Sequence, residues 1–149
     1  MSQVIHPSAV AYQDVDLSWL IGRSVTDLYI QGSSFWRLAF GVDASITVEC
    51  LWRIVGHEGI MRTSEDHGQQ FGKPAPVDAA KEATELLSNR QVIAAQLSAG
   101  TSDITIEFTG SIKLEIISNS AGYESWQLHD SLGMSYVAQG GGQLYKWKS

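Results

Sequence analysis

The chain has 149 residues, with 16 acidic against 10 basic side chains and a formal net charge of −6. This length fits one domain, residues 1–149, that can bury a hydrophobic core without disulfides. The charge opposes binding to a phosphate backbone, so we expect no nucleic-acid partner. It favours a cationic protein partner, although acidity also serves solubility.

Residues 1–15 are expected to form a loosely ordered lead-in. Residues 1–7 have neither the basic patch nor the apolar run of a signal peptide, and no stretch of the chain is long enough to cross a bilayer. The single cysteine, Cys50, lies in an alternating apolar row and has no partner for an internal disulfide. These features predict a cytoplasmic protein without a membrane partner.

A short helical turn at 16–22 precedes strands expected at 24–31, 35–40 and 45–52, which residues 52–55 continue. Turn-forming residues at 32–34 and 41–44 separate these strands. Alternate residues of a strand face opposite sides, so Arg37, Thr47 and Glu49 should point away from the core. The expected buried row consists of Leu28, Ile30, Trp36, Leu38, Phe40, Ile46, Val48 and Cys50.

Residues 56–76 are polar and interrupted by glycines. A connection of this length is unusual in a compact domain, which makes the segment a candidate for function or mobility. Residues 78–88 are the one substantial predicted helix, because apolar residues recur at helical spacing and Asp78 suits its N-terminus. This helix is expected to pack on the sheet between two sets of strands.

Further strands are expected at 91–98, 103–108 and 112–118, with turns at 99–101 and 109–111. Segments 124–129, 135–139 and 144–147 then add two hairpins. Gly140-Gly141-Gly142 lies between strands and not before a helix, so it indicates a turn instead of a phosphate-binding loop.

Two parts of the chain, about 22–55 and 89–129, match each other. The matched segments are Arg23-Ser24-Val25 with Arg90-Gln91-Val92, Trp36-x-Leu38-x-Phe40 with Ile104-x-Ile106-x-Phe108, and Ile46-x-Val48-Glu49-Cys50 with Ile112-x-Leu114-Glu115-Ile116. Such matched alternation is typical of a duplicated unit. The predicted fold is α+β and strand-rich, with duplicated antiparallel β-meander units, a pseudo-twofold axis and one main helix between the units. In this alignment Glu49 and Glu115 occupy the same place.

The polar segment holds the candidate metal ligands His57, Glu58, Asp66 and His67, with Glu65 beside them. Imidazole and carboxylate groups suit zinc or iron, but the spacing matches no standard motif, and solvated loop residues are the alternative interpretation. Glu58 and Asp66 could also form a general acid–base pair. No serine lies in a nucleophile elbow. We therefore expect no cofactor and no catalytic residues outside this alternative.

Tryptophan is frequent on the predicted strands, and most such side chains belong to a core. For a partner surface the better candidates are Trp52 with Arg53, and Tyr145 with Trp147 on the last strand, a candidate sheet edge. Trp, Tyr and Arg dominate contact energies at interfaces, which is why these four residues are singled out.

Four segments carry a family resemblance: Glu49-Cys50-Leu51-Trp52-Arg53-Ile54, Ser64-Glu65-Asp66, Leu114-Glu115-Ile116-Ile117-Ser118-Asn119-Ser120-x-x-Tyr123-Glu124-Ser125-Trp126-Gln127-Leu128, and Gly140-Gly141-Gly142-Gln143-Leu144-Tyr145-x-Trp147. The chain from about Leu20 onward resembles a bacterial family of small uncharacterised, internally duplicated β-rich proteins. Some relatives lie near genes for polymorphic toxins and their immunity proteins. The resemblance implies a duplicated strand-rich fold and no catalytic residues.

Three functions follow as hypotheses. The first is a non-enzymatic protein-binding module, such as an immunity protein that occludes a basic toxin domain. The second is a metal-dependent or acid–base enzyme that uses the 57–67 segment. The third is a structural protein that self-associates as a homodimer through an exposed terminal strand.

Overall fold

A computed structural model describes residues 7–32 and 35–148. The expectations for residues 1–6, and for 33–34 of the first turn, lie outside the described residues. The first sheet, sheet A, consists of β1 (Ser8–Ala9), β2 (Asp27–Gln31), β3 (Phe35–Ala39), β4 (Ser45–Val48), β10 (Trp126–His129), β11 (Met134–Ala138) and β12 (Leu144–Lys148). The second, sheet B, consists of β5 (Leu51–Gly56), β6 (Gly59–Thr63), β7 (Val92–Leu97), β8 (Ile104–Phe108) and β9 (Ile112–Ile117).

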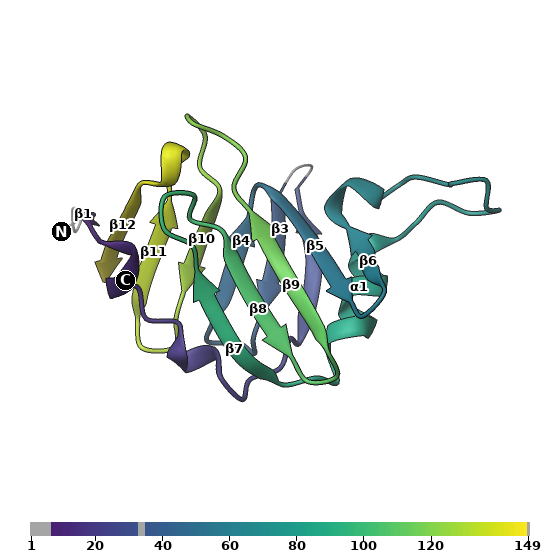
Figure 1. Cartoon of the computed structure of the whole chain (residues 1–149), viewed down its shortest axis with the longest axis horizontal. Helices are drawn as coiled ribbons and strands as arrows, with labels where there is room; N and C mark the ends of the chain where they lie inside the picture. The colour runs from purple at the N-terminus through teal and green to yellow at the C-terminus, as the bar shows by residue number, and fades with distance from the viewer. Residues whose placement is uncertain (1–6, 33–34, 149) are drawn as a thin grey trace.

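The fold is two antiparallel sheets with one helix, α1 (Ala79–Leu87), so the strand-rich α+β class is confirmed (Figure 1). Sheet A runs in the order β1-β12-β11-β10-β4-β3-β2, and sheet B in the order β6-β5-β9-β8-β7. Four short 3-10 helices, η1 (Tyr12–Asp14), η2 (Ser18–Leu20), η3 (Ser64–Asp66) and η4 (Gly140–Gly142), lie in the described connections. No described helix has the length and apolar character needed to span a membrane.

The chain changes sheets after each three-stranded meander. Strands β2-β3-β4 form a meander in sheet A, and the next strand, β5, crosses to sheet B and pairs with β9. Strands β7-β8-β9 form a meander in sheet B, and the next strand, β10, crosses to sheet A and pairs with β4. The β2-β3-β4 meander is thus extended by β10, and the β7-β8-β9 meander is extended by β5.

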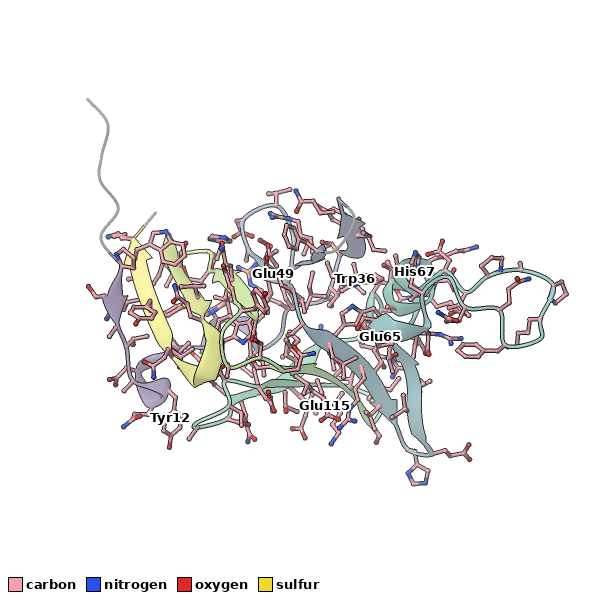
Figure 2. All side chains as sticks on the ribbon, turned by 90° about the horizontal axis from the view of Figure 1, so that it is seen from above. Tyr12, Trp36, Glu49, Glu65, His67 and Glu115 are labelled. Atoms are coloured by element: carbon pink, nitrogen blue, oxygen red, sulfur yellow. The ribbon has the colours of Figure 1, made fainter. Side chains whose placement is uncertain are left out.

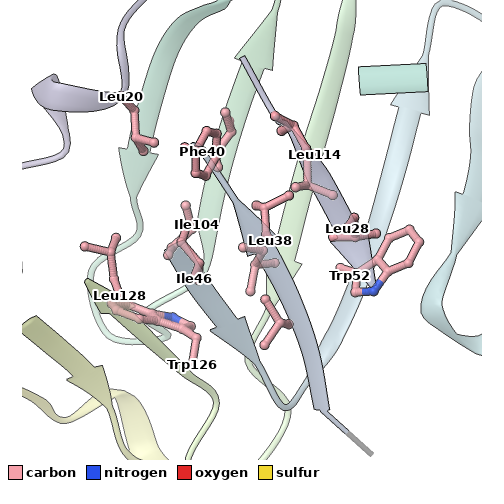
Figure 3. Packing of buried hydrophobic residues seen from close by; sticks show 14 of the residues in the cluster. Leu20, Leu28, Leu38, Phe40, Ile46, Trp52, Ile104, Leu114, Trp126 and Leu128 are labelled. Atoms are coloured by element: carbon pink, nitrogen blue, oxygen red, sulfur yellow. The ribbon is translucent and has the colours of Figure 1, made fainter. Parts of the chain in front are cut away.

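The inner faces of the two sheets share one core (Figure 3). Trp36 of sheet A and Trp52 of sheet B meet edge to face, with ring centroids 5.0 Å apart. The expected buried row is buried except for Ile30, which is half-buried and packs against the core. Each large apolar side chain buried in this way contributes about 1.5–3 kcal/mol, so this shared interior holds the two layers together.

Two segments close the open ends of the sandwich. At one end α1 lies beside β2 and β6, instead of on the sheet between two units as the sequence predicted (Figure 1). The backbone N–H of Leu28, at the β2 edge of sheet A, donates to the Thr84 hydroxyl of α1 at 3.1 Å. The helix thus provides a partner for one backbone group of this edge. At the other end the segment 12–21 inserts the buried side chains of Val15, Leu17 and Leu20 beside β7.

Some sequence expectations need correction. The polar segment contains strand β6 and η3, and the lead-in contains β1 and η1. Strand β12 is not the edge of its sheet, because Ser8 and Ala9 pair with Lys146 and Tyr145. The triple glycine does form the turn between β11 and β12, as expected.

Glu49 and Glu115 do not occupy the same place. Glu49 follows β4, and its N–H donates to the Ser125 carbonyl at 2.8 Å. Glu115 lies within β9, opposite both Arg53 and Thr105, and Figure 2 shows the two glutamates well apart. The hairpin registers place Ile46 opposite Leu38 and Leu114 opposite Ile106, which shifts the sequence alignment by two residues. A shift of two leaves the apolar alternation unchanged, so the sequence pattern could not detect it.

Candidate functional site

One surface cleft combines carboxylates with exposed aromatic rings. It has a volume of about 600 Å³ and is lined by Phe35, Glu49, Asn119, Ser120, Tyr123 and Glu124. Glu49 comes from the crossover between β4 and β5, and the last four residues come from the crossover between β9 and β10. The cleft therefore lies where the chain changes sheets in both directions.

Short backbone contacts shape the β9–β10 connection. The Ser120 hydroxyl oxygen accepts from the N–H groups of Gly122 and Tyr123, at 3.1 and 2.9 Å. The Gly141 N–H donates to the Ser120 carbonyl at 3.1 Å. These contacts hold a tight turn that leaves the Tyr123 side chain 82% exposed at the mouth of the cleft.

The triple glycine packs closely against this connection. A Cβ on Gly140 would lie 2.4 Å from the Gly122 nitrogen, and one on Gly142 would lie 2.0 Å from the Gly100 carbonyl oxygen. Real Cβ atoms do not approach backbone that closely, so the contact requires glycine. Its role in the structure is close packing of three loops.

The cleft is electronegative. Partial burial raises the pKa of the Glu49 carboxyl, and the nearby negative charge of Glu124 raises it further. Gln127 donates to Glu124 at 2.5 Å and fixes that carboxylate at the cleft. The described lining contains no lysine or arginine. Two carboxylates therefore face one space without a basic residue in its wall.

This arrangement suits a cationic side chain. An ammonium or guanidinium group can pair with a carboxylate and also lie over an aromatic ring. Phe35 is 43% exposed, so both aromatic rings of the lining are available to a ligand. Among the described lining residues, the groups that can contact a ligand are therefore carboxylates, aromatic rings and the polar groups of Asn119 and Ser120.

The structure does not bring the candidate metal ligands together. His57 and Glu58 are exposed at the β5–β6 turn. The Asp66 carboxylate accepts from the Thr63 N–H at 3.0 Å and pairs with Arg62 at 3.3 Å. Across residues 7–32 and 35–148, no group of three or more His, Cys, Asp or Glu side chains is arranged to hold a metal ion.

His67 has a structural role beside α1. Its Nδ1 accepts the Ala79 N–H at 3.1 Å, and its ring meets Trp36 edge to face at 5.5 Å. Figure 2 shows His67 with Glu65 at the end of the molecule that carries α1. The predicted cluster thus separates into a hairpin tip and the residues that start the helix.

The four candidate partner residues do not form one surface. Trp52 is only 1% exposed and belongs to the core, which corrects its placement at a partner surface. Its neighbour Arg53 points outward from sheet B and pairs with Glu115 at 3.3 Å. Tyr145 and Trp147 are half-buried on the outer face of sheet A, where Trp147 meets His129 edge to face. Arg53 and Trp147 therefore face opposite sides of the sandwich.

Burial also decides the chemistry of Cys50. Its side chain is 8% exposed, and burial raises the pKa of the thiol to about 12. A thiol of this kind stays protonated at neutral pH and is a poor nucleophile.

The sequence reasoning missed most of the cleft. Phe35 and Glu49 follow an alternating strand pattern, while Tyr123 and Glu124 precede a strand, so nothing in the sequence joins them. The local signal was an aromatic residue next to an acid in the polar segment between β9 and β10. Comparisons with models of protein families, with curated proteins and with solved structures find no match.

Proposed function

We propose that the protein is a non-enzymatic binding module that captures a cationic segment of a partner protein in the cleft. The observation that carries this proposal is the wall of the cleft, where Glu49 and Glu124 face the same space as Phe35 and Tyr123 and no basic side chain is present among the described lining residues. An uncompensated pair of carboxylates attracts a cation, and exposed aromatic rings favour a lysine or arginine over a bare ion.

Electrostatics also supports the proposal at long range. The formal net charge of −6 would steer a basic partner toward the molecule and speed association. Binding a cation beside Glu49 would lower the pKa of this carboxyl, because the bound charge offsets both burial and the repulsion from Glu124. Affinity should therefore increase as the pH rises through the pKa of Glu49.

One form of this function is an immunity protein that occludes a basic toxin domain. The acidic charge and the resemblance to a family with relatives near toxin and immunity genes support this form. We also propose the cytoplasm as the compartment, because the single cysteine is buried and unpaired with another cysteine.

Coexpression tests the proposal. Each protein encoded beside this gene is produced with the tagged chain, and both copurification and protection of the cells are measured. We expect one basic protein to copurify with the tagged chain. It should no longer copurify with the variant that carries both Glu49→Gln and Glu124→Gln. The matched control Glu58→Gln, at the exposed β5–β6 turn, should retain it. Failure to capture or neutralise any neighbouring product would refute the immunity form. Capture that survives the double substitution would refute the cleft.

We further propose that the fold arose by duplication of a β-meander unit. The reciprocal crossovers support this idea, since Trp52 pairs with Ile116 and Trp126 pairs with Val48. The guanidinium groups of Arg23 and Arg90 also make similar bonds, to the carbonyls of Phe40 and Thr109 at the following turn. Exchanging Arg53-Ile54 with Gln127-Leu128 tests the proposal. We expect the exchanged variant to unfold cooperatively, like the parent chain. Loss of the folded state would contradict the correspondence of residues 53–54 with residues 127–128.

A further inference from the structure

Strand β7 is an edge of sheet B whose outer side is paired only at its start. The Gly22 N–H donates to the Val92 carbonyl, and the Val92 N–H donates to the Arg23 carbonyl, both at 2.8 Å. The chain before Gly22 then turns away through η2. Among the described residues, no backbone group bonds to the outer side of residues 93–97.

A groove fills the space between β7 and the diverging N-terminal segment. It has a volume of about 570 Å³, with residues 93–97 on one wall and the segment 12–21 on the other. Figure 1 shows this segment passing beside β7. Tyr12, Ile21 and Ile93 line the groove and are 44%, 51% and 57% exposed. Large apolar side chains gathered around a free strand edge are typical of a binding surface.

Helix α1 lies against two other strand edges in the described part of the molecule, β2 and β6. The Thr84 hydroxyl occupies the β2 edge at Leu28, and Arg62 of β6 pairs with Glu82 of α1 at 2.7 Å. Helix α1 therefore protects the edges at its end of the sandwich. The 3-10 helix η2 contacts β7, but no described backbone group bonds to the outer side of residues 93–97.

The charge around the groove selects the occupant. Asp14 and Asp16 are exposed on the N-terminal segment, between residues that line the groove, although they do not line it themselves. Hydrogen bonds from the Ser18 side chain and backbone lower the pKa of Asp16, so this carboxylate is ionised at neutral pH. The described residues that line the groove include no lysine or arginine. A second copy of the chain would bring the same net charge of −6 against itself, whereas a basic segment would be attracted.

We propose that the β7 groove docks an extended segment of a partner protein, with basic and apolar side chains in alternation, as an added strand of sheet B. The added strand would continue the pairing that Gly22 and Arg23 begin at Val92. Its backbone would bond to β7, its apolar side chains would contact Ile21 and Ile93, and its basic side chains would lie beside the segment that carries Asp14 and Asp16. This docking uses a different surface from the cleft and stands without it.

Nuclear magnetic resonance with capped octapeptides tests the proposal. The peptides alternate Lys with Val, Ile, Leu, Phe or Tyr, and the full chain is titrated with each. We expect shifts and slowed amide exchange at residues 93–97 for at least one peptide. The same peptide with Glu in place of Lys, or with alternate backbone nitrogens methylated, should bind about tenfold more weakly or not at all. No response at 93–97 to any peptide would overturn the proposal.

A pair of variants locates the binding. Ile93→Lys, on β7, should weaken the peptide about tenfold. Ile60→Lys, at a residue 59% exposed on β6 at the other edge of sheet B, should not. Glu124→Gln should also leave this binding unchanged, which separates the groove from the cleft. Equal weakening by Ile60→Lys would overturn the proposal, as would a concentration-dependent dimer that Ile93→Lys abolishes, because the occupant would then be a second copy.

Discussion

Trp52 and Trp126 occupy corresponding places in the two sheets, yet only one indole N–H has a partner. Each lies opposite the last inward residue of the other meander, Ile116 for Trp52 and Val48 for Trp126. Both side chains are at most 1% exposed. The Trp126 Nε1–H donates to the Ser102 carbonyl at 2.8 Å, whereas the Trp52 Nε1 has no hydrogen-bond partner among the described residues.

This difference predicts unequal costs for the same substitution. Both Trp52→Phe and Trp126→Phe shrink a buried ring. Trp126→Phe also leaves the buried Ser102 carbonyl without its donor, while Trp52→Phe removes an unsatisfied N–H. We expect Trp126→Phe to lower the free energy of unfolding by about 1–3 kcal/mol more than Trp52→Phe, measured by urea denaturation. Equal losses would contradict the assigned bonding.

The close approach of Gly142 to Gly100 predicts a second pair of variants. Gly142 has φ +83°, and a Cβ there would collide with the Gly100 carbonyl, so Gly142→Ala should lower the free energy of unfolding by more than about 2 kcal/mol. The control is Gly122→Ala, because a Cβ at Gly122 would meet no atom within 4 Å. Thermal and chemical denaturation compare the two variants. A tolerated Gly142→Ala would refute the close packing of the loops.

Glu49 predicts a pH dependence of stability. Because burial and the charge of Glu124 raise its pKa, the folded state holds more protons on this carboxyl than the unfolded chain does. The contribution of Glu49 to stability is therefore largest below about pH 4.5, the ordinary pKa of a glutamate, and declines as the pH rises through the raised pKa. Glu49→Gln should remove this decline, and Glu124→Gln should reduce it. Urea denaturation from pH 4 to 7 measures the slopes; a wild-type slope unchanged by Glu49→Gln would exclude this origin.

His129 predicts a change of stability with pH that is opposite in sign to that of Glu49. Burial, with a smaller effect from the charge of Arg37, lowers its pKa from 6.5. The folded state then binds fewer protons than the unfolded chain, so stability is lost as the pH falls from about 6.5 through the lowered pKa. Imidazole titration by nuclear magnetic resonance should give a pKa below 6.5, and Arg37→Gln should move it upward. A wild-type value at or above 6.5 would contradict the burial of this ring beside Ser135.

The strands and the helix could largely be predicted from local sequence patterns. In a strand apolar and polar residues alternate, and in a helix apolar residues recur about every 3.6 residues. Strand β6 was missed because its Ile60 and Met61 are exposed on an edge, where the apolar pattern is weak. The reciprocal crossovers could not be predicted, since alternation does not say which sheet a strand joins. The cleft depends on those crossovers, and so its three segments meet only in the folded chain.

Titration of the cleft with capped tripeptides that carry one central lysine or arginine tests the central claim most directly. Nuclear magnetic resonance should show shifts concentrated at Phe35, Glu49, Tyr123 and Glu124, weakened by added salt and lost in the variant with both Glu49→Gln and Glu124→Gln. Shifts spread evenly over the acidic surface, or unchanged in the double variant, would contradict the account.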